Sequence, residues 1–245
     1  MGRTPASGFA TSARHRATAP TRLGLTLRSV ALAPRDGFAA AFRTSERRAR
    51  AGERPPEGWT PYVLGATGGA AVMSLWLKAG ALGSRGGADP GSVDPALLVA
   101  ALVAGALLVL GGQLLWGVLG PRLADRLGGC ALGRDLRLVW GAAALPQTLS
   151  LAVLVVLDLL VVGPSLYGGG PLADPLGRAW AALSIALALA LAVWSLWLFV
   201  RGLQVAGGLD LARATALAGG AVATCALVVG TAAAFAAALA ARTSL

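Results

Sequence analysis

The chain of 245 residues is dominated by apolar side chains: 56% are hydrophobic, 13% are charged, and the mean hydropathy is +0.69. Because the apolar residues fall in long blocks, this composition excludes an ordinary soluble globular domain and predicts a membrane protein. The net charge of +10 comes from 21 basic and 11 acidic residues, and its placement between the apolar blocks indicates membrane topology rather than nucleic-acid binding.

The amino-terminal part of the chain precedes the apolar blocks. Residues 1–26 are rich in Arg, Ala, Ser and Thr and lack acidic residues, so we predict a disordered, basic cytoplasmic tail. Residues 27–58 are predicted to form a membrane-proximal amphipathic segment and a polar linker. Pro34 suits a helix start, and Phe38 and Phe42 fall on one helical face. The alternative for the amphipathic segment is a continuation of the tail.

Five uncharged runs follow, and each is long enough to cross a bilayer. A helix needs roughly 20 apolar residues to cross ~30 Å of hydrocarbon. The runs between consecutive charged residues contain 20, 27, 20, 22 and 28 residues, and they are apolar on every face. We therefore predict an all-α, polytopic bundle of five transmembrane helices. Residues 59–241 form this domain, with spans at about 59–82, 96–119, 137–163, 179–200 and 213–241, and residues 242–245 form a short outer tail.

Basic residues orient these spans. With the amino terminus inside, eleven arginines lie near the inner ends of the spans and three near the outer ends. The positive-inside rule therefore predicts an inner amino terminus and an outer carboxyl terminus. The outer three are Arg85, Arg178 and Arg242.

The third span begins in an unusual stretch, GRDLRLVWGAAALPQTL at 133–149. We expect Arg134 and Arg137 to stay at the inner membrane interface. Pro146 lacks an N–H and leaves a backbone carbonyl without its helical partner, so it predicts a kink in the inner half of the span. The small residue Gly141 and its neighbours would give another helix room to pack there.

Two ionisable residues fall inside the spans. Lys78 and Asp158 lie at about the same depth, ~7 Å from the outer ends of the first and third spans. Ionisable residues inside a membrane span are costly, so each is expected to have a partner and a functional or structural role. The two residues form an ion pair if these spans touch, whereas otherwise each side chain snorkels to the nearby surface.

Other chemistry has little support in the sequence. The single histidine, His15, lies in the tail, and Cys130 and Cys225 lie in different predicted environments. We therefore predict no metal site, no cofactor, no catalytic residue and no disulfide framework.

One region resembles a known family. The segment 117–155 is similar to the Yip family of five-span membrane proteins, in which a Gly-Gly turn precedes a basic amphipathic stretch and a span that opens with glycine and proline. Gly128, Gly129, Arg134 to Arg137, Gly141 and Pro146 occupy those places. Residues 193–218 resemble the family's fourth span and following loop, and the likeness covers about 27–241. Eukaryotic members bind Rab-type (Ypt) GTPases, but their DLYGP-type element is absent here, so the likeness to bacterial members does not imply GTPase binding.

The resemblance implies a non-enzymatic protein of membrane organisation or partner recruitment, in the bacterial cytoplasmic membrane. Expected partners are the lipid bilayer, proteins that meet the tail and inner loops, and a second copy of the chain. The alternative is a small transporter or channel subunit, in which Gln113, Asp158 and Pro146 would line one cavity.

Overall fold

The computed structural model describes residues 29–50, 59–83, 95–167 and 174–243, and this part of the chain is helical, with no strand. The elements in chain order are α2 (Pro34–Arg50), α3 (Thr60–Gly83), α4 (Pro95–Arg126), α5 (Gly133–Ala143), α6 (Leu145–Val161), the 3₁₀ turn η1 (Pro164–Tyr167), α7 (Pro175–Gly207) and α8 (Leu211–Thr243). The all-α prediction is therefore confirmed. The predicted tail at 1–26 lies outside the described residues.

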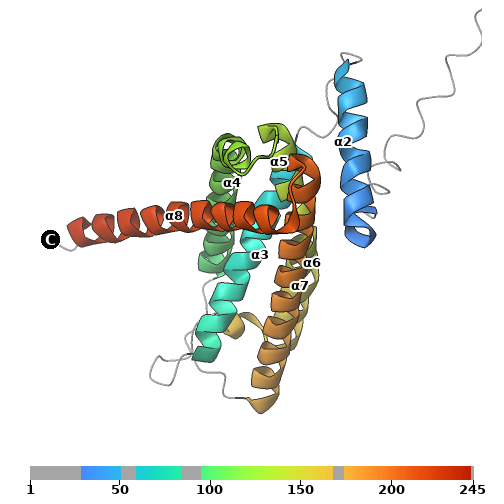
Figure 1. Cartoon of the computed structure of the whole chain (residues 1–245). Coiled ribbons are helices and arrows are strands. Elements are labelled where there is room, and N and C mark those ends of the chain that lie inside the picture. Colours follow the sequence, from blue (N-terminus) through green and yellow to red (C-terminus); the bar gives the residue numbers. More distant parts are fainter. Residues whose placement is uncertain (1–28, 51–58, 84–94, 168–173, 244–245) are drawn as a thin grey trace, which may run out of the picture.

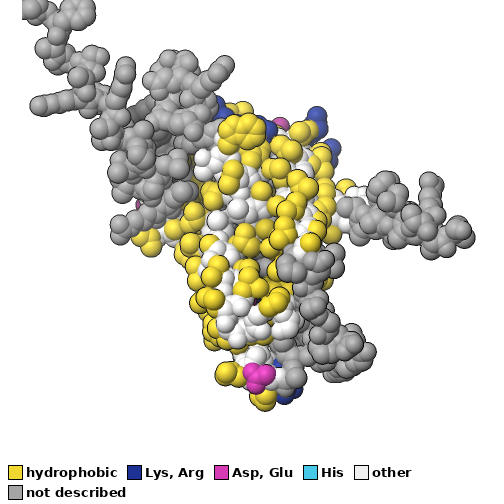
Figure 2. All heavy atoms as spheres, turned by 180° about the vertical axis from the view of Figure 1, so that it is seen from behind, with side chains coloured by type: hydrophobic (Ala, Val, Ile, Leu, Met, Phe, Trp, Pro, Cys, Tyr) yellow, Lys and Arg dark blue, Asp and Glu magenta, His cyan; other side chains and the backbone are white. Residues whose placement is uncertain are grey.

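Four parts of the described chain are long and apolar enough to cross a membrane: Leu98–Arg126, Gly133–Val161, Pro175–Gly207 and Leu211–Thr231. The first predicted span, α3, has span length but is not among them, because it contains glycines, hydroxyl residues and Lys78. Leucine and valine side chains cover the middle of the molecule, and Lys and Arg gather toward its ends (Figure 2). This surface is the one that an integral membrane protein needs.

The long helices differ in direction. α3, α6 and α7 run lengthwise, whereas α8 (red) crosses them and its carboxyl-terminal part projects away from the bundle (Figure 1). The first turns of α8 pack on α4 and α7 through Ala214, Leu217 and Ala221. The orientation of α8 as a fifth span, with an outer carboxyl terminus, therefore stays a prediction.

The third predicted span differs from its expected form. Instead of one kinked helix, two helices meet at Ala144, which ends α5 and precedes α6. Pro146 lies in the first turn of α6, where a missing N–H is tolerated because that turn has no partner for it. The predicted bend is thus a one-residue interruption at Ala144, across which the backbone bonds Ala144 N–H to Trp140 O and Thr148 N–H to Ala144 O are kept.

The amphipathic segment before the first span is also longer than expected. α2 extends to Arg50, through residues that were assigned to the polar linker, because alanine, arginine and glutamate favour helix. Of the two residues on the predicted face, Phe38 is buried and Phe42 is half-buried against the core, and α2 packs against α7.

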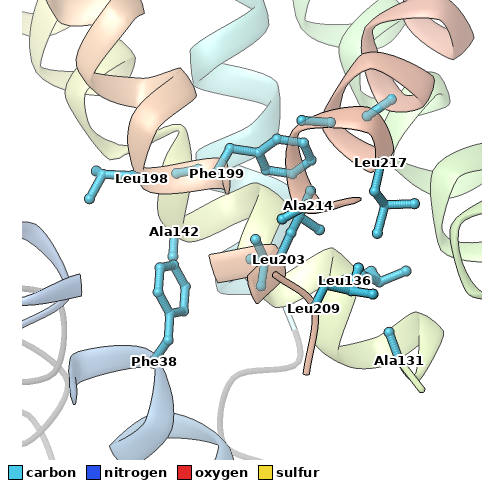
Figure 3. Packing of buried hydrophobic residues seen from close by; sticks show 14 of the residues in the cluster. Phe38, Ala131, Leu136, Ala142, Leu198, Phe199, Leu203, Leu209, Ala214 and Leu217 are labelled. Atoms are coloured by element: carbon cyan, nitrogen blue, oxygen red, sulfur yellow. The ribbon is translucent and has the colours of Figure 1, made fainter. Parts of the chain in front are cut away.

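Most of the core lies at the end of the bundle where α4 ends and α5 and α8 begin, which is the predicted inner end. Five helices contribute to it, including Phe38 of α2, Leu136 of α5, Leu203 of α7 and Leu217 of α8 (Figure 3). Trp116 of α4 is fully buried in the same cluster. This core fixes the inner loops to the bundle.

Candidate functional site

Lys78 and Asp158 meet inside the bundle. Lys78 Nζ lies 2.5 Å from Asp158 Oδ2, and the two side chains are 1% and 0% exposed. Lys78 comes from α3 and Asp158 from the last turn of α6, and these two helices are in contact. Of the two arrangements that the sequence allowed, the structure places the side chains as a pair and leaves neither at the surface.

Three neutral side chains complete this site. Tyr167 Oη donates to Asp158 Oδ2 at 3.0 Å, and Trp180 Nε1 donates to Asp158 Oδ1 at 2.9 Å. Lys78 Nζ donates to Ser184 Oγ at 3.0 Å and lies 5.9 Å from the centre of the Tyr167 ring. We call these five residues the ion-pair network. It joins α3, α6, η1 and α7, so each charge has a partner and at least one further hydrogen bond.

Tyr167 closes the network toward the predicted outer end. Burial raises the pKa of its hydroxyl, and the negative charge of Asp158 and the hydrogen bond to it raise that pKa further. The raised pKa favours the protonated hydroxyl, which is the form that donates to Asp158. Leu166 beside it is fully buried in an apolar cluster with Val155 and Ala181, which fixes η1 next to the ion pair.

The Gly-Gly turn lies at the inner end and connects two loops. Gly128 has φ of +78°, and Gly129 N–H donates to Ala124 O at 2.9 Å, which ends α4 in a left-handed cap. Cys130 N–H then donates to Gly207 O at 3.1 Å. A Cβ on Gly129 would lie 2.8 Å from the same carbonyl, so only glycine fits this approach. The loop at 127–132 is thereby bound to the loop at 207–210, and we call the two the inner loop pair.

The two arginines of the inner interface lie on α5. Arg134 is 41% exposed and its Nε lies 3.3 Å from Asp135 Oδ1. Arg137 is half-buried, and its side chain lies against Gly117 of α4. The structure therefore brings neither of them to the ion-pair network.

Gly141 and Pro146 serve packing. Gly141 lies directly against Pro61 of α3, and no Cβ would fit between them. Pro146 is buried at the start of α6. Gly141 thereby lets α5 approach the start of α3 closely.

Gln113 is a separate buried polar site. Its Nε2 donates to Pro61 O at 3.1 Å and to Arg137 O at 3.2 Å. Its Oε1 lies over Gly65, and among the described residues this atom and Trp116 Nε1 are buried without a hydrogen-bond partner. Because Gly65 and Lys78 are 13 residues apart on α3, Gln113 and Asp158 are about 20 Å apart along the helix. The cavity that the transporter alternative requires is not formed by these two side chains.

A sequence model of the Yip1 domain matches residues 32–233, which is most of the chain. The chain belongs to the Yip1 domain family. This match confirms the resemblance that the Gly-Gly turn and the following span indicated. No curated protein and no solved structure is similar enough to match.

The ion-pair network and the inner loop pair both lie within the Yip1 domain. With its four long apolar helices, this member of the family is an integral, multi-pass membrane protein. The lipid bilayer is accordingly one of its partners.

The sequence did not reveal three members of the network in this Yip1 domain. No motif in the sequence singled out Trp180 or Tyr167. Ser184 gave no signal beyond being a hydroxyl residue within an apolar run. One usable signal was present: each of the three lies near the outer end of its element, at the depth of the two charges.

Proposed function

We propose that this Yip1-domain protein is a non-enzymatic, five-span scaffold of the bacterial cytoplasmic membrane, and that its inner end recruits protein partners. The observation that carries this proposal is the inner loop pair. Two loops that are far apart in sequence are joined by the backbone hydrogen bond from Cys130 N–H to Gly207 O, and each follows a helix that ends in a left-handed glycine, which supports one fixed surface. A fixed surface loses little conformational entropy when a partner binds.

The exposed side chains of this surface suit recognition. Leu132 and Cys130 are exposed in the first loop, and Arg126 and Arg213 are exposed on the adjacent helix ends. Arg213 is held by Asp210, whose Oδ2 lies 3.6 Å from its Nε. An apolar side chain beside guanidinium groups favours a protein partner with an acidic, partly apolar surface.

Five spans require that α3 cross the membrane although it is the least apolar of the long helices. The ion-pair network supports this crossing, because it neutralises Lys78 and hides it from lipid. The arginine distribution supports an inner amino terminus. The absence of a free carboxylate in the ion-pair network, where the described Asp158 is fully engaged, supports a role without catalysis.

The test is copurification in mild detergent, with substitutions at the inner end and at the outer end of the bundle. We expect the proteins that copurify with the full chain to be lost when Arg126 and Arg213 are both replaced by alanine. Arg178→Ala at the outer end is the matched control and should keep them. A chain that lacks residues 1–26 shows how much of the copurification depends on the tail. If the loop variant and the Arg178 variant retain the same proteins, the inner loop pair is not the recruiting surface.

A further inference from the structure

In the described part of the chain, nothing neutralises the guanidinium group of Arg137. Its side chain leaves α5 and lies along α4, where a Cβ on Gly117 would be 2.9 Å from Arg137 Cδ. Among the described residues, no ion pair and no side-chain hydrogen bond includes this guanidinium group. Arg134, three residues earlier on the same helix, is paired with Asp135. Arg137 is therefore the cation of α5 that is left for an anionic ligand.

The surroundings of Arg137 favour the level of lipid headgroups. Gln113 Nε2 donates both to Arg137 O and to Pro61 O, so this turn of α5 and the start of α3 lie side by side. Trp59, two residues before Pro61, is 82% exposed, and its ring packs edge-to-face against Tyr62. Exposed tryptophan and tyrosine side chains of membrane proteins favour the headgroup region. This aromatic pair therefore supports a position of Arg137 close to the lipid phosphates.

An exposed apolar strip begins beside Arg137 and runs along α4 toward the middle of the bundle. It consists of Val118, Leu114 and Leu107, which are 55%, 47% and 62% exposed. Their spacing of four and seven residues places them on one helical face. Gly117 borders this face, because it lies one turn after Leu114 and directly before Val118. The strip rises about 16 Å, which is close to half of the ~30 Å hydrocarbon core and so to the depth of one leaflet.

We propose that Arg137 and this strip bind one anionic phospholipid of the leaflet at the predicted inner end. The lipid phosphate accepts hydrogen bonds from the Arg137 guanidinium group, and one acyl chain lies along Val118, Leu114 and Leu107. We call these four residues the lipid site. Guanidinium groups bind phosphate oxygens through two parallel hydrogen bonds, and basic positions between membrane helices on the cytoplasmic side suit anionic headgroups. A phospholipid fits because its negative charge and its apolar chain follow each other in the same order as the cation and the strip.

The lipid site is separate from the inner loop pair. Gly117, on which Arg137 lies, is nine residues before Arg126, so the two levels are about 13 Å apart along α4. A protein segment at the deeper level would have to bring its own backbone polar groups against the exposed leucines of α4, which is costly at a lipid-facing surface. A lipid carries no such groups along its acyl chain. The proposal therefore does not depend on partner recruitment, and it is tested with lipids alone.

Native mass spectrometry of the delipidated full chain in detergent tests the class of ligand. We expect one dioleoyl phosphatidylglycerol to bind more tightly than dioleoyl phosphatidylethanolamine, because the first headgroup has a net negative charge and the second has none. Glycerol 1-phosphate at the same concentration should not displace the bound lipid, because it has no acyl chain for the strip. Equal binding of the two lipids, or displacement by glycerol 1-phosphate, would overturn the proposal.

The variant Arg137→Met tests the site itself. It keeps an apolar stem on Gly117 and removes the charge, so we expect the affinity for phosphatidylglycerol to fall about tenfold, as for the loss of one hydrogen bond to a charged group. Arg201→Ala is the matched control. It also removes one positive charge, but from the inner end of α7, where Arg201 contacts Trp197 and Gln204. It should keep the affinity of the wild type.

Two results would contradict this assignment. An unchanged affinity in Arg137→Met would show that its guanidinium group does not bind the phosphate, and equal losses in both variants would show an effect of net charge rather than a site. The midpoint of thermal unfolding reports whether each variant is folded. If Arg137→Met does not fold, the comparison of the two lipids and glycerol 1-phosphate in the wild type decides.

Discussion

Asp158→Ala is expected to reduce the amount of folded protein in the membrane more than any other single substitution in the bundle. It removes the carboxylate that accepts from Lys78, Tyr167 and Trp180, and it leaves an ammonium group buried without a counter-charge. Removal of one partner of a buried ion pair costs about 3–5 kcal/mol. The measurement is the yield of monodisperse protein in detergent and its midpoint of thermal unfolding.

A variant that lacks both charges tests whether Lys78 and Asp158 stabilise the fold as a pair or independently of each other. Lys78→Ala in addition to Asp158→Ala removes the uncompensated charge, so we expect part of the lost stability to return. Asp174→Ala is the control, because Asp174 only caps the start of α7 through Gly177 N and should cost about 1 kcal/mol. Strictly additive losses in the double variant would contradict a coupled pair.

Phe38→Ala is expected to detach α2 from the bundle. Phe38 is fully buried against α7 and α5, where a Cβ on Gly202 would lie 3.0 Å from its ring and Val139 lies beside the same glycine. Truncation of a buried phenylalanine costs about 3–5 kcal/mol. Because the other buried residues in the described part of α2, Pro34, Gly37 and Ala41, are small, we expect this cost to appear as local opening rather than as loss of the whole fold.

Hydrogen exchange measures that opening. Amide protons of α2 should exchange much faster in Phe38→Ala, whereas those of α6 and α7 should remain protected. Arg43→Ala lies on the exposed side of the same helix and should leave the protection of α2 unchanged. Protection of α2 that survives Phe38→Ala would show that another contact holds this helix.

Much of the helical organisation could be predicted from the uncharged runs alone, since a length of apolar sequence is a direct requirement of a membrane-embedded helix. The residues at which the helices end were less predictable. α4 continues to Arg126, seven residues past its predicted end, because a helix does not have to stop where its charged residues begin. The break at Ala144 was expected near this place as a kink, but its form depends on the packing of Gly141 against Pro61, which no local pattern contains.

The ion pair was one of two open alternatives, because depth can be read from the sequence but helix neighbours cannot. Once α3 and α6 are adjacent, the position of Lys78 relative to Asp158 follows. The partners Tyr167, Trp180 and Ser184 depend on how η1 folds back and how α7 is rotated, and both are tertiary features. The Gly-Gly turn was found by its likeness to the family, whereas its contact with the loop at 207–210 was not foreseen.

The central claim, a five-span bundle with its inner loop pair in the cytoplasm, is tested most directly by cysteine labelling in intact cells. In a Cys225→Ala background, Cys130 reports on the inner loop pair and Gly80→Cys reports on the outer end of α3, where a side chain meets no neighbour within 4 Å. We predict that an impermeant maleimide labels Gly80→Cys from outside and modifies Cys130 only after the membrane is opened. Labelling of Cys130 in intact cells would contradict the orientation, and labelling of both positions from the same side would contradict the crossing of α3.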